Sequence, residues 1–178
     1  MKFSDLAEVY EQLEKTSSGN ALRRILADLF RKVQKNEIDK VAHLTLGRIA
    51  SDYADINLGM AEKMVLRAVA EASGKEQQEA TRLFKKLGDI GLVAEELVGR
   101  KRKDLGVSEV FDTLHRIASA SGAGSQEQKV SLLAGLLRNA SAKEARYIAR
   151  IVQGNLRLGV GDKTVLHALC ITFTGSRC

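Results

Sequence analysis

The sequence predicts an all-α fold, and three observations support this prediction. Apolar residues recur at every third or fourth position along most of the chain, as in the run Leu6, Val9, Tyr10 and Leu13. No segment alternates strictly between apolar and polar residues, as a half-buried strand would. Proline is absent, so glycines and polar caps must end the helices. We therefore expect an irregular bundle of roughly ten helices joined by short glycine turns.

Three serines mark expected helix starts, because each is followed three positions later by Glu or Gln. In such a capping box, the serine and the later side chain satisfy each other's free backbone N–H groups. The expected boxes are Ser73 with Glu76, Ser125 with Gln128, and Ser141 with Glu144. Asp162 is the expected cap of the last helix, where its negative charge suits the helix dipole.

The length of 178 residues fits one domain. Four consecutive cations, residues 100–103, lie in a soft stretch between Gly99 and Gly106. The cations of this stretch could contact phosphates, but a solvated loop is the favoured interpretation, and the stretch suggests a boundary between lobes 1–99 and 107–178.

The composition favours a cytoplasmic protein with a polyanionic partner. The net charge of +6 and the pI of about 9.4 raise the prior for nucleic acid. No apolar run approaches the roughly 20 residues that span a bilayer, so no membrane partner is expected. The first residues lack the apolar core of a signal peptide.

The stretch Leu156–Thr164 combines two glycines with flanking cations. It is expected to end one helix, turn, and open another, which exposes backbone N–H groups at the positive end of a helix dipole. Arg157 and Lys163 add full charges on either side. We therefore expect a phosphate site that is similar to a helix-hairpin-helix turn. Its expected contact residues are Arg157, Gly159, Val160, Gly161, Lys163 and Thr164.

A second glycine turn, Ser121–Lys129, shows the same order of glycines, polar cap and cation. An ordinary capped turn without a ligand explains it equally well. The expected contact residues are Gly122, Gly124, Ser125, Gln128 and Lys129.

Two further segments are candidates for backbone contacts. Arg146, Arg150 and Asn155 lie on or just after the helix before Leu156, and the two arginines share a helix face. The run Lys85–Gly91 joins two expected helices and fits either a third contact or a simple corner. We favour the corner.

No catalytic residue and no metal ligand is predicted. His43, His115 and His167 have no ligand partner three or four positions away, and no nucleotide-binding loop or nucleophile motif is present. We expect no cofactor in this chain and no autonomous enzyme activity.

Several segments together resemble the N-terminal DNA-binding domain of ATP-dependent DNA ligases, with archaeal and eukaryotic replicative ligases closest. The matching segments cover nearly the whole chain in order. They are Phe3–Ser17, Gly47–Ala50, Leu58–Ala61, Lys86–Glu95, Ser121–Lys129, Glu144–Arg150 and Leu156–Leu169.

The resemblance implies an all-helical domain that grips nicked duplex DNA in the minor groove through phosphates and sugars, without sequence specificity, in replication and repair. It also implies that ATP and Mg²⁺ act in adenylation and OB-fold domains, which are absent here together with the K-x-D-G adenylation motif. Two departures stand out. Residues 47–53 lack the family's proline, and residues 100–106 lack the Gln and aromatics of a sliding-clamp motif, so a clamp partner is possible but not evident.

A helical protein-interaction adaptor is the alternative. In that case the glycine turns only redirect the chain, and the C-terminal helices bind a protein.

Overall fold

The computed structural model describes residues 1–50, 58, 60–99 and 102–176 of the chain. Within these residues it contains ten α-helices, one short 3₁₀ helix and no strand, which confirms the all-α prediction. The helices are α1 Phe3–Glu14, α2 Gly19–Lys32, α3 Ile38–Thr45, α4 Glu62–Ser73, α5 Gln77–Leu87, α6 Ile90–Leu97, α7 Val107–Ser119, α8 Ser125–Asn139, α9 Ala142–Gln153 and α10 Asp162–Thr174, with the 3₁₀ helix η1 at Lys35–Glu37.

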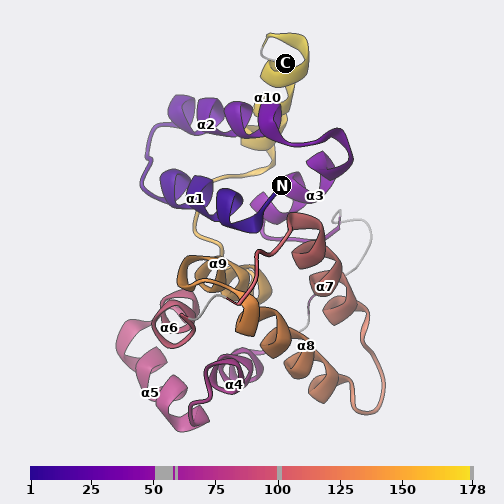
Figure 1. Ribbon diagram of the computed structural model, residues 1–178. Coiled ribbons are helices and arrows are strands. Elements are labelled where there is room, and N and C mark those ends of the chain that lie inside the picture. The colour runs from indigo at the N-terminus through magenta and orange to yellow at the C-terminus, as the bar shows by residue number, and fades with distance from the viewer. Residues whose placement is uncertain (51–57, 59, 100–101, 177–178) are drawn as a thin grey trace.

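Helices from the two ends of the chain pack against each other. In Figure 1, α1, α2, α3 and α10 form the upper part, while α4 to α9 form the lower part. α2 packs on α10, α4 on α8, and α6 on α9. These contacts join helices from both sides of the expected boundary between residues 1–99 and 107–178.

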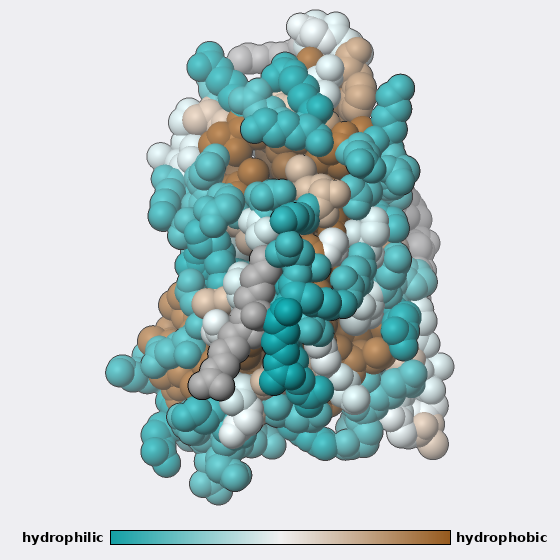
Figure 2. Space-filling model, viewed as in Figure 1, coloured by the Kyte–Doolittle hydropathy of each residue, from teal (hydrophilic) through white to brown (hydrophobic). Residues whose placement is uncertain are grey.

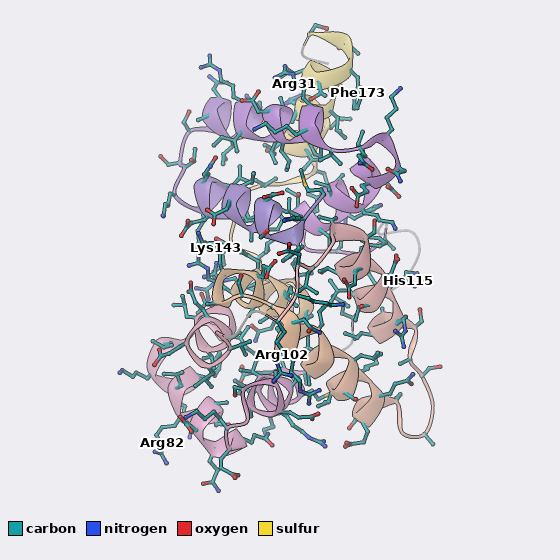
Figure 3. The ribbon with its side chains drawn as sticks, viewed as in Figure 1. Arg31, Arg82, Arg102, His115, Lys143 and Phe173 are labelled. Carbon is teal, nitrogen blue, oxygen red and sulfur yellow. The ribbon has the colours of Figure 1, made fainter. Side chains whose placement is uncertain are left out.

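α9 occupies the centre and is held on one side by α1. The rings of Tyr10 and Tyr147 meet edge to face with centroids 5.4 Å apart, and both side chains are fully buried. Such aromatic pairs contribute about 1 kcal/mol beyond their buried area. At the surface, Lys143 bonds Glu8 and Glu11 of α1 at 2.8 and 2.9 Å, and it is labelled in Figure 3 at this junction. The hydrogen bond from Lys143 lowers the pKa of Glu11 to about 2.

The other side of α9 lies unusually close to α6. A Cβ built on Gly91 would stand 2.7 Å from Arg150 Cγ and 2.9 Å from the carbonyl oxygen of Arg146. No side chain fits in that space, so glycine is required for α6 to pack against α9.

One of the three expected capping boxes is confirmed. Ser141 Oγ accepts from the N–H of Glu144 at 3.2 Å, and the Glu144 carboxylate accepts from the N–H of Ser141 at 2.7 Å.

The box at Ser73 is wrong, because Ser73 is the last residue of α4 and donates to the carbonyl of Ala70. Gly74 follows with φ of +70° and ends α4, so α5 begins only at Gln77. A glycine in the left-handed region closes a helix, and here that role outweighs the capping pattern.

The box at Ser125 is also wrong, because Gly124 takes the cap position with φ of +77° and no side chain caps α8. Asp162 differs by one position as well, since the cap of α10 is Gly161 and Asp162 is the first helical residue. In both cases the glycine before the expected cap takes the N-cap position, and the expected cap residue is the first residue of the helix.

Among the described residues, no helix is both long enough and apolar enough to cross a membrane.

Candidate nucleic-acid interface

The turn between α9 and α10 surrounds an open hollow of about 450 Å³. Gly154 ends α9 with φ of +76°, and the N–H of Asn155 bonds the carbonyl of Arg150 at 3.0 Å. Beyond this point, side chains alternate between buried and exposed. Leu156 and Leu158 are buried, while Arg157 between them is exposed. The hollow is lined by Thr45, Leu46, Gly154, Asn155, Leu156, Arg157, Leu158, Gly159, Val160 and Gly161. The turn therefore anchors itself through its leucines and presents backbone and polar groups outward.

α10 begins at this hollow without a side-chain cap. The carbonyl of Gly161 accepts from the N–H groups of Thr164 and Val165 at 2.9 and 3.1 Å. Lys163 is exposed and makes no ion pair with any residue in the described part of the chain. Because the first N–H groups of a helix carry its positive dipole end, this arrangement suits an anion.

Arg157 adopts an uncommon backbone conformation. Its φ of +60° makes it the one non-glycine residue with positive φ among those the structure describes. This conformation costs about 1 kcal/mol for an L-residue, so the neighbouring leucines must hold it in place. The side chain is 47% exposed, and its Nη1 lies 3.6 Å from Oδ2 of Asp89. Arg157 thus stands at the rim of the hollow beside the corner between α5 and α6.

Arg150 does not reach the surface. Its side chain is 3% exposed and pairs with Asp89 at 2.6 Å and with Glu14 at 3.0 Å. Burial lowers the pKa of Arg150, but the hydrogen bond and charge of Asp89 outweigh this and raise it. Burial likewise raises the pKa of Asp89, yet Arg150 holds it below its ordinary value. The pair joins α9 to α6 inside the domain.

Arg146 is also engaged internally. Its side chain is 12% exposed and lies 3.4 Å from both Glu11 and Glu95. The expectation that Arg146 and Arg150 face a groove is corrected by this geometry, because α1 and α6 cover the face of α9 that both residues share.

The turn between α7 and α8 is more open. Gly122 and Gly124 are exposed and have φ of +82° and +77°. The carbonyl of Gly124 accepts from the N–H of Gln128 at 3.1 Å. Lys129 is half-buried, and its Nζ donates to the carbonyl of Leu58 at 3.3 Å. Its ammonium group is thus already engaged.

An acid in the first turn of α8 is neutralised by α4. Both guanidinium Nη atoms of Arg67 donate to the Glu127 carboxylate at 2.6 Å. This hydrogen bond lowers the pKa of Glu127 and raises that of Arg67.

The two turns lie in different parts of the molecule. In Figure 1, α8 begins at the lower right, and α10 begins behind α2 in the upper part. The connection between α3 and α4 contacts both, because Arg48 pairs with Asp162 and the carbonyl of Leu58 bonds Lys129. The family's missing proline concerns residues 47–53, of which 51–53 lie outside the described residues. If both turns bind one duplex, they bind separate phosphates.

Sequence reasoning missed the partners of three residues that organise these turns, Asp89, Arg48 and Arg67. Asp89 was recognisable as a helix cap, but its partner Arg150 is 61 positions away. Arg67 and Glu127 are 60 positions apart. Only the glycine turns themselves left a local signal.

The described residues contain no group of three or more His, Cys, Asp or Glu side chains arranged to hold a metal ion.

The described residues form an all-α domain with an open, cation-flanked turn at a helix N-terminus, a geometry that suits an anion. The chain itself belongs to the DNA ligase family, because the family model described as DNA ligase N terminus matches residues 2–170. This confirms the resemblance seen in the sequence motifs.

The relatives are named as DNA ligases or probable DNA ligases. The chain is 46% identical over 190 residues to DNA ligase 2 of Thermofilum pendens, which covers 99% of this chain and 32% of that protein. It is 46% identical to a probable DNA ligase of Dictyoglomus thermophilum, covering 95% of this chain and 29% of the relative. The chain is 40% identical to the DNA ligase of Acidianus ambivalens, and the match covers 99% of this chain and 32% of that protein. The chain thus spans about a third of the length of the curated relatives it matches.

Proposed function

We propose that this domain grips the sugar-phosphate backbone of nicked duplex DNA in the minor groove, as the DNA-binding part of an ATP-dependent DNA ligase. The observation that carries the proposal is the hollow between α9 and α10, where an uncapped helix start meets Arg157 and Lys163. Amides and cations attract phosphates and read no base sequence. Binding without sequence preference is what sealing a nick anywhere in a genome requires.

The geometry narrows the set of contact residues. The primary contacts are Asn155, Arg157, Gly159, Val160, Gly161, Lys163 and Thr164, all at the turn between α9 and α10. The exposed turn at Gly122, Gly124, Ser125 and Gln128 is a secondary contact, with Lys129 behind it. Arg146 and Arg150 support α9 from inside.

The sealing reaction itself is assigned to other domains. These 178 residues contain no K-x-D-G motif, so ATP and Mg²⁺ would act outside them, in adenylation and OB-fold domains of a complete ligase. In a cell, we place the domain in the cytoplasm on chromosomal DNA, in replication and repair. A sliding clamp remains a second candidate partner, although residues 100–106 lack its usual motif.

Equilibrium binding tests the proposal. Affinity for nicked duplex, intact duplex and single-stranded DNA would be measured by fluorescence anisotropy over a series of salt concentrations. We expect binding to duplex that weakens steeply with salt, because each neutralised phosphate releases counterions. No binding, or binding that ignores salt, would contradict the proposal.

A protein-interaction adaptor is the second candidate function, and one observation favours it. Leu166 and Phe173 lie seven positions apart on α10 and are 56% and 59% exposed. Figure 3 shows Phe173 at the upper end of the molecule. Charge reversal at Lys163 separates the two functions, because it should abolish DNA binding and leave an apolar interface intact.

A further inference from the structure

We propose that the outer face of α5 next to the α5–α6 corner, formed by Arg82, Lys85 and Lys86, is a further DNA-backbone contact that continues the hollow between α9 and α10. This inference rests on the proposed function. It extends the footprint on the duplex to a segment of the chain where the sequence favoured a simple corner.

The corner between α5 and α6 lies beside the hollow. Gly88 ends α5 with φ of +67°, and Asp89, the next residue, caps α6. Asp89 Oδ2 lies 3.6 Å from Arg157 Nη1, and Arg157 is at the rim of the hollow. In Figure 1, α5 and α6 lie together at the lower left, beside α9. The α5–α6 corner, which directly follows the last turn of α5, therefore adjoins the α9–α10 turn.

The cations on α5 lie on the outer face of this helix. The apolar residues Ala80, Leu83, Phe84 and Leu87 form the inner face of this helix. Arg82, Lys85 and Lys86 are exposed on the outer face, and Figure 3 shows Arg82 extending away from the body at the lower left. None of the three makes an ion pair or side-chain hydrogen bond with a residue that the structure describes.

The acidic group at the corner is already paired within the domain. Asp89 is the acidic group at this corner, but Arg150 already binds its carboxylate through two hydrogen bonds of 3.2 and 2.6 Å. The same carboxylate accepts from the N–H of Gly91 at 2.8 Å, so the start of α6 is capped and offers no anion site. Attraction at this corner must therefore come from side-chain cations, and Arg82, Lys85, Lys86 and Arg157 supply it.

A simpler role exists for two of these residues. Lysines in the last turn of a helix interact with the negative end of its dipole, which is worth about 0.3–1 kcal/mol. Lys85 and Lys86 meet that description. Arg82 lies outside the last turn, and a dipole role predicts no change in DNA affinity when the lysines are replaced. The two roles thus differ in a measurable quantity.

The spacing of the cations on α5 suits successive phosphates in one DNA strand. Arg82 and Lys86 are four positions apart, which is about 6 Å along the helix axis. Phosphates of one strand follow each other at about 3.4 Å along the duplex axis, so α5 spans about two of them.

The test is the salt dependence of binding by the double variant Lys85→Gln/Lys86→Gln. On a long nicked duplex, we expect the slope of log K against log salt to fall by about two, one for each lost phosphate contact. The matched control is Lys32→Gln/Lys35→Gln, which removes the same charge at the end of α2 and in η1, where both lysines are exposed. The control should change the slope by much less than one. An unchanged slope in the Lys85/Lys86 variant, or an equal fall in the control, would overturn the inference.

Two additions separate this inference from the proposed function. Arg157→Gln reports on the hollow itself, so a fall in slope there without one at Lys85/Lys86 refutes only the α5 contact. If the unaltered domain does not bind, the proposed function fails as well. Shortening the duplex on either side of the nick is the second addition. The Lys85/Lys86 effect should vanish on DNA too short to reach α5, while the Arg157 effect persists, and an effect that survives on the shortest DNA would contradict an extended footprint.

Discussion

The two glycine turns have nearly the same sequence signature but different surroundings. At α9–α10, buried leucines anchor the turn, Arg157 is fixed at its rim, and Lys163 is exposed without an ion pair among the described residues. At α7–α8, both glycines are exposed, and Lys129 is bonded to the carbonyl of Leu58. Glycines and a nearby cation therefore suggest a phosphate site. Residues distant in the sequence determine whether that cation is free to bind a phosphate.

The turns also share a feature that the sequence does not reveal. Each following helix carries an acid in its first turn, Asp162 or Glu127, and an arginine from elsewhere pairs with it. Arg48 pairs with Asp162, and Arg67 pairs with Glu127. Both arginines thereby offset a charge that would repel phosphate. Figure 2 shows hydrophilic residues spread over much of the visible face, so charge alone does not single out a site.

The largest expected effect on stability comes from Asp89→Asn. Asparagine still caps α6, but Arg150 loses a buried carboxylate, and breaking such a pair costs about 3 kcal/mol. Chemical denaturation at neutral pH would measure the loss. A change below about 0.5 kcal/mol would contradict the assigned role of this pair.

The same variant makes a pH prediction. Arg150 holds the folded-state pKa of Asp89 below its ordinary value of 3.8, so the stabilisation is complete above 3.8 and is lost as pH falls through the folded value. The unaltered domain should therefore lose more stability below pH 3.8 than Asp89→Asn does. Parallel acid-denaturation curves for the two proteins would argue against this.

A smaller loss is expected for Gly91→Ala. The added Cβ would stand 2.7 Å from Arg150 and force α6 away from α9, at a cost of about 2 kcal/mol. Gly135 in α8 is the matched control, because a Cβ there meets no atom within 4 Å. Gly135→Ala should stabilise by about 0.5–1 kcal/mol, since glycine is unfavourable inside a helix. Thermal melting compares the two, and equal effects would show that the tight α6–α9 contact is not limiting.

Alanine substitutions at Gly159 and Gly122 compare the two turns directly. Gly159 and Gly122 have φ of +66° and +82°, so alanine costs about 1 kcal/mol of stability at either position. DNA affinity should fall more for Gly159→Ala, because only that turn borders the hollow. If Gly122→Ala weakens binding more, the ranking of the turns is reversed.

The smallest expected effect is that of Arg67→Gln. The pair with Glu127 is largely exposed and screened by solvent, so its loss should leave stability nearly unchanged. If the α7–α8 turn contacts DNA, the freed carboxylate should weaken binding slightly, and Arg67→Gln/Glu127→Gln should restore it. Anisotropy at low salt can detect such a difference, and failure of the double variant to recover would exclude the electrostatic explanation.

Local patterns in the sequence were sufficient to predict the helices and their approximate number. The spacing of apolar residues reports which face of each helix is buried, and Ser141 with Glu144 marks the start of α9 correctly. Ser73 ends α4 instead of starting a helix, and Ser125 starts α8 but forms no capping box, because an adjacent glycine in a left-handed conformation takes the cap position. That choice depends on where the next helix packs.

The two arginines of α9 show what the sequence alone could not predict about the site. Their spacing of four places them on one face, but the spacing does not tell whether solvent or protein covers that face. The acids that bury Arg150 come from α1 and α6, 136 and 61 positions earlier in the chain. By contrast, the glycine turn at residues 154–161 was recognisable because its geometry is local.

The most direct test of the account is the salt dependence of nicked-duplex binding by three single variants: Arg157→Gln, Lys163→Gln and Lys129→Gln. We expect the log–log slope to fall by about one for Arg157→Gln and for Lys163→Gln, and by clearly less for Lys129→Gln, whose ammonium is bonded within the domain. Slopes unchanged at Arg157 and Lys163, or a larger fall at Lys129, would contradict the claim that the α9–α10 hollow is the principal phosphate site.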